Sequence, residues 1–267
     1  MDILEFVKSF LLGIIEGITE WLPISSTGHM ILFNEFFKNE GSFLESQLYL
    51  YVIQLGAILA VVTLFFNKLN PFSLKKSATE KSNTWKMWYK VIIACVPAGV
   101  IGLAFNDFME KFENWQVVSA MLIIYGIAFI VVEKLQKKTT VTSIDQMSYK
   151  TALTIGAFQV LSIIPGTSRS GSTILGGMLV GCSREIAAEF SFFLAIPIMF
   201  GVSFLKIITH EGPIEWGLLL VGMLVSYIVS MIAIKFLMNY VKKHSFASFG
   251  WYRIVLGVLV IGYFLIK

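Results

Sequence analysis

The chain has 267 residues, of which 56% are hydrophobic and only 14% are charged, with a formal net charge of +4. Soluble domains carry about 25% charged residues, so this composition, with a mean hydropathy of +0.76, excludes a soluble domain and indicates an integral membrane protein. The two cysteines, Cys95 and Cys182, lie in or beside apolar segments and suggest neither a disulfide framework nor paired metal ligands.

The first predicted element is a re-entrant hairpin over residues 3–37, whose two short apolar halves are divided by Pro23 and Gly28. Three segments of spanning length follow, at about 47–66, 88–105 and 116–133. A second re-entrant hairpin covers residues 150–181 and is divided by Pro165-Gly166. Three further spans follow, at about 187–206, 215–236 and 250–266. Broken helices of this kind are tolerated only where they are buried in protein or line a cavity.

The expected fold is therefore all-α, a single membrane domain over 1–267 with six transmembrane helices and two hairpins. Its halves, 1–134 and 149–267, each hold one hairpin and three spans, and the odd number of spans makes the repeat inverted. One predicted face carries fifteen of the 21 basic residues: Lys68, Lys75, Lys76, Lys81, Lys86, Lys90, Lys134, Lys137, Lys138, Lys150, Arg184, Lys235, Lys242, Lys243 and Arg253. The positive-inside rule makes this face cytoplasmic, with both termini and the first hairpin outside. The start of the chain lacks a basic n-region and a cleavage site, so we expect no removable signal peptide.

The two hairpins share a sequence pattern. Residues 13–32 align without a gap with residues 156–175, 143 positions later, and the matches include Ser25 with Ser168 and Gly28 with Gly171. The ionisable residues differ between the copies. Glu16, Glu20 and His29 align with Gln159, Ile163 and Ser172, and Ser26 aligns with Arg169. We infer a shared architecture with divided chemical tasks, and a site where the two turns meet.

The first hairpin offers a cation site and an anion cradle. Glu16 and Glu20 are four residues apart, so both project from one face of a half-helix and are suited to hold a hard divalent cation. Ser25, Ser26 and Thr27 stand at the start of the next half-helix, where free N–H groups and the helix dipole favour a phosphate.

The second hairpin offers a matching cradle. Ser168, Ser170 and Thr173 supply hydroxyl groups around its turn. Arg169, between them, carries a planar guanidinium suited to bidentate phosphate contact. Residue types alone therefore indicate a site for a phosphate group and a cation within the membrane.

The motifs closely resemble those of a known family. Glu16-Gly17-Ile18-Thr19-Glu20, Ser25-Ser26-Thr27-Gly28-His29 and Pro165-Gly166-Thr167-Ser168-Arg169-Ser170-Gly171-Ser172-Thr173 are similar to the bacterial undecaprenyl-diphosphate phosphatases, also called the bacitracin-resistance family. The resemblance covers essentially the whole chain, including Ile53-Gln54-Leu55-Gly56 and Glu189-Phe190-Ser191-Phe192. It implies hydrolysis of a C55 isoprenyl diphosphate to the monophosphate carrier of cell-wall synthesis, on the outer face of the plasma membrane, and hence bacitracin resistance. It also implies a divalent cation, Mg²⁺ or Ca²⁺, and lipid partners without nucleic acid, while a homodimer stays open.

For the mechanism we expect Glu16 and Glu20 to hold the cation and Arg169 to stabilise the phosphoryl group in transfer, with Ser26 as nucleophile and His29 as general base. Nucleophilic attack by His29, or by a metal-activated water, stays an alternative. The remaining substrate-binding residues are expected to be Ser25, Thr27, Ser168, Ser170, Thr173, Gly166 and Gly171.

Other interpretations compete with this one. Glu16, Glu20 and Arg169 would also suit a structural ion network, the hydroxyls are ordinary helix caps, and His29 would suit simple packing. A polyprenyl-phosphate transporter or flippase would use the same inverted repeat and cradle without a nucleophile or base. A type-2 phosphatidic acid phosphatase is disfavoured, because the chain lacks that family's Lys-x6-Arg-Pro element and its second histidine with a paired aspartate.

Overall fold

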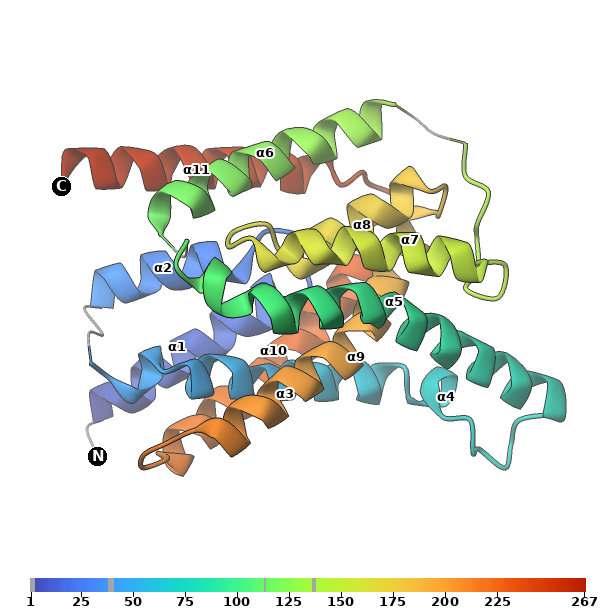
Figure 1. Ribbon diagram of the computed structural model, residues 1–267, viewed down its shortest axis with the longest axis horizontal. Coiled ribbons are helices and arrows are strands. Elements are labelled where there is room, and N and C mark those ends of the chain that lie inside the picture. The colour runs from blue at the N-terminus through green and yellow to red at the C-terminus, as the bar shows by residue number, and fades with distance from the viewer. Residues whose placement is uncertain (1–2, 38–40, 113, 136–137) are drawn as a thin grey trace.

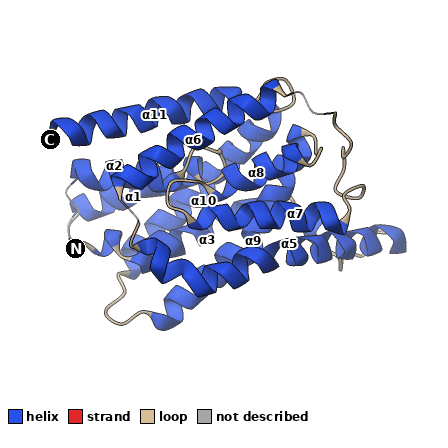
Figure 2. Ribbon diagram, turned by 45° about the horizontal axis from the view of Figure 1, so that its top comes forward, coloured by secondary structure: helices blue, strands red, loops and turns tan. Residues whose placement is uncertain are grey.

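The computed structural model describes residues 3–37, 41–112, 114–135 and 138–267. Within these ranges the chain forms α-helices and two single-turn 3-10 helices, Phe43–Glu45 and Leu161–Ile163, without a β-strand (Figure 2). The α-helices are α1 (Ile3–Thr19), α2 (Ser26–Phe37), α3 (Gln47–Leu64), α4 (Phe66–Leu69), α5 (Ala78–Glu110), α6 (Trp115–Lys134), α7 (Tyr149–Val160), α8 (Arg169–Leu179), α9 (Arg184–Thr209), α10 (Trp216–Tyr240) and α11 (Ala247–Ile266).

Six of these helices, α3, α5, α6, α9, α10 and α11, are long and apolar enough to cross a membrane. Large apolar side chains project outward from them, among them Leu103, Leu220 and Leu259. A soluble surface does not carry so much exposed hydrocarbon, so the chain is a multi-pass membrane protein. The six long apolar helices predicted from the sequence are confirmed.

The start of α5 differs from the prediction. Hydropathy placed this span at 88–105, whereas the helix begins at Ala78. Its first turns carry Lys81 and Lys86 and are polar, but they contain good helix formers. Hydropathy detects only the apolar part of a helix, so it missed the extension.

Four of the other helices, α1, α2, α7 and α8, form two pairs, each interrupted by a turn. In Figure 1, α1 and α2 lie toward the end of the bundle where α11 finishes, whereas α7 begins at the opposite end and α8 returns toward it. The turn between α1 and α2 and the turn between α7 and α8 both lie inside the bundle. α1 packs against α10, and α7 packs against α5.

Small residues let these helices approach closely. A Cβ atom on Gly156 of α7 would lie 2.1 Å from the Ala94 carbonyl oxygen of α5, and one on Gly56 of α3 would lie 2.1 Å from the Met223 carbonyl oxygen of α10. Such backbone-to-backbone contact is how helices pack where hydrocarbon surrounds them. It holds α7 and its turn firmly against the rest of the bundle.

Two basic residues lie elsewhere than expected. Lys90 and Arg253 were counted with the basic inner loops, but their exposed fractions are 5% and 0%. Lys90 donates to the carbonyl oxygens of Ile144 and Asp145, and Arg253 of α11 donates to carbonyl oxygens in the bundle interior. Both cations are buried because backbone acceptors replace their water.

The two cysteines are free thiols, as the sequence indicated. Cys182 follows α8 and is buried. Burial raises the pKa of its thiol to about 11, which keeps it protonated and unreactive at neutral pH.

Candidate functional site

Two serines mark the interrupted helices by their backbone conformation. Ser25 has a φ of 72° and Ser168 a φ of 75°, and within the described ranges no other non-glycine residue has a positive φ. Each serine side chain accepts a hydrogen bond from the helix it precedes, from Gly28 N at 3.4 Å and from Gly171 N at 3.1 Å. A left-handed serine costs about 1 to 3 kcal/mol and persists only where the surrounding structure enforces it. Equivalent strain at both aligned positions points to a functional turn.

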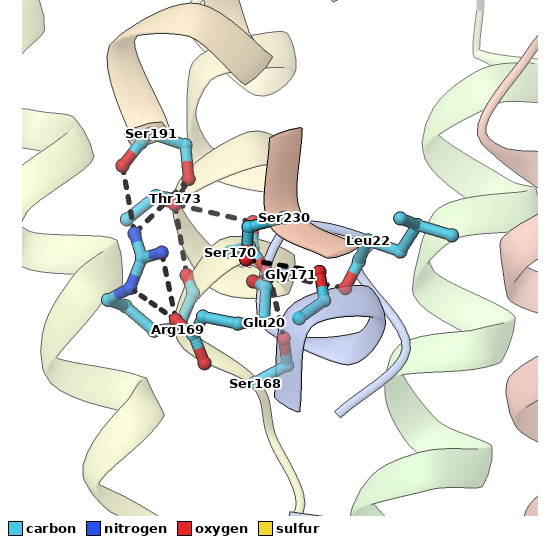
Figure 3. A network of polar contacts seen from close by, with 10 residues as sticks. Glu20, Leu22, Ser168, Arg169, Ser170, Gly171, Thr173, Ser191 and Ser230 are labelled. Carbon is cyan, nitrogen blue, oxygen red and sulfur yellow. Dashed lines mark hydrogen bonds and ion pairs between the residues drawn. The ribbon is translucent and has the colours of Figure 1, made fainter. Parts of the chain in front are cut away.

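The strongest contact between the turns is an ion pair (Figure 3). Arg169 Nη2 lies 3.0 Å and Nε lies 3.2 Å from Glu20 Oε1, and both side chains are about nine-tenths buried. Arg169 Nη1 donates to the Ser191 carbonyl oxygen of α9 at 2.8 Å. The guanidinium also lies 5.9 Å from the ring centre of the buried Trp21. Residues 149 positions apart in the sequence therefore meet in one shielded ionic site.

Two of the hydroxyl groups predicted to bind phosphate, those of Ser170 and Thr173, form hydrogen bonds within the protein. Ser170 Oγ donates to the Glu20 carbonyl oxygen at 2.9 Å, which ties α8 to the first turn. Thr173 Oγ1 donates to the Arg169 carbonyl oxygen at 2.9 Å and lies 2.7 Å from Ser191 Oγ. Both side chains are buried, so the structure places them behind the ion pair, where they support it.

A cavity of about 250 Å³ opens beside the ion pair. Its polar lining includes Glu20, Ser26, Gln54, Gln159, Ser168 and Arg169, and Gly166 lines it with backbone. Residues of α5 and α9 supply its apolar wall. A pocket that combines charged and hydroxyl groups with one apolar wall suits an amphipathic phosphate ester.

A larger cavity of about 410 Å³ lies beside the Arg184–Glu133 ion pair at the base of α9. Its lining lacks the hydroxyl cradle and broken turns found around Arg169. Volume therefore does not identify the site, and we assign it from the chemistry of the lining residues.

One carboxylate and one amide near the ion pair are incompletely bonded. Glu16 is 2% exposed, and its Oε1 has no hydrogen-bond partner among the described residues. Gln159, the residue aligned with Glu16, is 1% exposed, and both polar atoms of its amide likewise lack a described partner. Buried polar atoms are nearly always satisfied, so these atoms indicate room for a ligand, an ion or water. The described residues contain no cluster of three or more His, Cys, Asp or Glu side chains that would complete a metal site by themselves.

The family model for the bacitracin resistance protein BacA matches residues 9–259 of the chain. This chain belongs to that family. Similar proteins include an undecaprenyl-diphosphatase of Enterococcus faecalis, 57% identical over 97% of both chains, and one of Lactiplantibacillus plantarum, 54% identical over 98% of both. An undecaprenyl-diphosphatase 1 of Clostridium acetobutylicum is 52% identical over the full length of both chains.

Within this family member, His29 is bonded away from Ser26. Its Nδ1 lies 2.7 Å from the Ser25 carbonyl oxygen and its Nε2 lies 2.7 Å from the Tyr252 hydroxyl of α11, and the two rings stack. Because a carbonyl oxygen only accepts, Nδ1 carries the proton, and in neutral His29 the basic Nε2 faces Tyr252. Ser26 itself is half-buried and lines the cavity.

The other predicted site residues also divide into those that line the cavity and those that do not. Ser168 lines the cavity and caps α8, whereas Ser25 is buried between α1 and α2 and Gly171 is buried near the start of α8. The side chain of Thr27 lies outside the described part of the structure. The predicted set thus includes both cavity-lining residues and residues that hold the turns.

The sequence did not identify several residues that contact the predicted site residues from other helices. Ser191 and Tyr252 contact Arg169 and His29 from the distant helices α9 and α11, and Arg253 contacts the turns themselves. Tyr252 carries no local signal of such a role, whereas Ser191 lies in the Glu189–Phe192 segment of the family resemblance and Arg253 is a cation inside a predicted span. Gln159 had a usable signal, because it occupies the position of Glu16 in the second copy of the motif.

Proposed function

We propose that this protein hydrolyses undecaprenyl diphosphate to undecaprenyl phosphate and inorganic phosphate, which recycles the lipid carrier of cell-wall synthesis and confers bacitracin resistance. The proposal is supported by relatives more than 50% identical over nearly the whole chain that are named undecaprenyl-diphosphatases. The observation that carries it is the Glu20–Arg169 pair, which lines one cavity together with the Ser26 hydroxyl.

In this proposal the α1–α2 and α7–α8 pairs are re-entrant hairpins of an inverted repeat. Matching positive φ values at Ser25 and Ser168, and the reciprocal packing of α1 on α10 and α7 on α5, support that reading. The basic loops around Lys68, Lys138 and Lys242 favour placing their end of the bundle in the cytoplasm. The termini and the site would then open to the outer side.

Two of the cavity-lining residues, Arg169 and Ser26, then act directly in the reaction. Arg169 binds oxygens of the terminal phosphoryl group and offsets the charge that develops on them, which in comparable sites is worth about 10³ to 10⁵ in rate. Ser26 Oγ attacks the terminal phosphorus, the bond to the bridging oxygen breaks, and undecaprenyl phosphate leaves. Water then releases inorganic phosphate from the serine. For His29 to take the Ser26 proton, its Nε2 must first leave the Tyr252 hydroxyl; His29 or a bound water as nucleophile are the alternatives.

A divalent cation, Mg²⁺ or Ca²⁺, fits the carboxylates. Glu16 and Glu20 are one helical turn apart, and the unpartnered buried Oε1 of Glu16 is an oxygen donor of the type that these ions prefer. Two carboxylates leave further positions for substrate oxygens and water. Such a cation would neutralise charge on the diphosphate.

A polyprenyl-phosphate transporter on the same scaffold is the second candidate, and it is not favoured. The relatives are named as diphosphatases, and carriage requires no nucleophile beside the arginine.

The test is phosphate release from undecaprenyl diphosphate by the purified protein in detergent, where no transmembrane gradient exists. We expect release that depends on Mg²⁺ or Ca²⁺ and stops with a chelator. Binding of the lipid without release, across several divalent cations, would instead support a transporter. Release that continues unchanged in the chelator would argue against the cation while leaving the phosphatase in place.

A further inference from the structure

Arg253 is a fully buried arginine outside the cavity. Its side chain projects from α11 and has an exposed fraction of 0%. Within the described part of the chain no carboxylate forms an ion pair with it; its guanidinium instead donates to backbone carbonyl oxygens only. Its guanidinium also lies 5.5 Å from the ring centre of Tyr125. A buried charge without a carboxylate partner is costly, so a role for this cation has to be sought in what it contacts.

The acceptors of Arg253 belong to both interrupted turns. Nη1 donates to the Pro23 carbonyl oxygen at 3.2 Å, in the turn between α1 and α2. Nη2 donates to the carbonyl oxygens of Gly166 at 2.9 Å and Thr167 at 3.0 Å, in the turn between α7 and α8. Nε and Nη2 also reach the carbonyl oxygens of Leu122 and Met121 in α6, at 3.4 Å and 3.3 Å. One side chain thus fastens three separate parts of the chain.

The chemistry of arginine suits this position. Carbonyl groups in a broken helix have lost their intrahelical partners, and each one buried without a donor destabilises the fold. A guanidinium presents five N–H groups in a rigid plane, enough to serve several carbonyls at fixed spacing, whereas an ammonium presents three from a single point. Gly166, one of the acceptors, also lines the cavity, and Ser168 and Arg169 follow two and three residues later.

We propose that Arg253 is a positioning residue that locks the two turns together and thereby sets Arg169 against Glu20 and Ser26. The inference rests on the phosphatase activity proposed above. It assigns to Arg253 no contact with substrate. Its effect on the reaction passes through the placement of Arg169.

The first test compares Arg253→Lys with the wild type and with Lys90→Met. Lys90 is the matched control, because it is also a buried cation that donates to backbone carbonyls, but in the loop at Ile144 and Asp145. Displacing catalytic groups by about 1 Å can cost about 100-fold in rate. We expect Arg253→Lys to lower kcat by about 10- to 100-fold with KM nearly unchanged, and Lys90→Met to lower the melting temperature while kcat stays near wild type.

A double-mutant cycle separates positioning from general damage. If Arg253 acts through Arg169, then Arg253→Lys should reduce kcat much less in an Arg169→Lys background than in the wild type. Fully multiplicative losses would overturn the proposal, and so would a folded Arg253→Lys protein with wild-type kcat.

Amide hydrogen exchange provides a readout that does not need activity. We expect Arg253→Lys to speed exchange at both turns, residues 20–28 and 165–171, and Lys90→Met to leave them unchanged. Arg253→Gln, which keeps two donors without the charge, serves as a second variant. If neither variant yields folded protein, Arg253 is a folding residue and the positioning role is wrong. Failure of the wild-type protein to release phosphate would refute the proposed function but not the positioning role, because hydrogen exchange would still test whether Arg253 holds the two turns together.

Discussion

Two arginines in this protein are buried by different means. Arg169 is matched by the Glu20 carboxylate and remains at the edge of a cavity, whereas Arg253 is matched by carbonyl oxygens and is sealed from it. In the first arrangement a phosphate can bind the guanidinium beside the carboxylate or in its place, because arginine–phosphate and arginine–carboxylate contacts are comparable in strength. The second fixes a guanidinium permanently in the structure.

Ser26 is the residue on which the chemistry can be tested most simply. If its hydroxyl is the nucleophile, Ser26→Ala should leave less than about 1% of wild-type kcat while the lipid still binds, since the missing interaction exists mainly in the transition state. The measurement is phosphate release together with lipid binding on the same protein. Ser248→Ala, a change near the exposed start of α11, is the control and should keep wild-type activity. Turnover well above that level would assign the attack to His29 or water.

Residue-scale predictions succeeded where a local pattern carried the information. The aligned turns pointed to Glu20 and Arg169 as facing charges, because ionisable groups in apolar segments need partners. The partner of His29 was not predictable in this way. Tyr252 lies 223 residues further along the chain in an ordinary apolar span, and only the packing of α11 brings it to the imidazole.

Among the elements, the broken helices depend on their unbroken neighbours. α7 is held where Gly156 touches the backbone of α5, so the second turn is positioned by a helix outside the motif. Long apolar helices were predictable from length and hydropathy. Their mutual contacts were not, because in lipid an apolar surface does not reveal which face meets protein.

This contact gives a prediction at the scale of the element. Gly156→Ala should destabilise the fold by about 1 to 3 kcal/mol, because the new Cβ would overlap the Ala94 carbonyl oxygen unless α7 shifts. Gly99→Ala is the control: it lies in α5 with nothing within 4 Å of its Cβ position, and alanine favours a helix. Thermal melts in detergent should show a lower Tm for the first variant only. Equal Tm values would mean that α7 does not depend on close packing with α5.

At the scale of the whole molecule, the site belongs to neither half of the chain. Glu20 and Ser26 come from the first half and Arg169 and Ser168 from the second, and a helix from each half, α6 and α11, closes over the turns. The sequence predicted that two similar segments would meet, since both combine interrupted helices with charge. It could not predict the support from α6, α9 and α11, which arises only when all the spans are assembled.

The most direct measurement is kcat for phosphate release from undecaprenyl diphosphate by Arg169→Lys, beside Arg184→Lys as control. Arg184 also forms an ion pair with a glutamate, Glu133, at the base of α9 and away from the turns, where the arginine side chain is 43% exposed. Lysine keeps the charge at position 169 but loses the planar fork, so kcat should fall by about 10³-fold or more while Arg184→Lys remains near wild type. A near-normal rate for Arg169→Lys would contradict the claim that the two halves meet to stabilise one phosphoryl group.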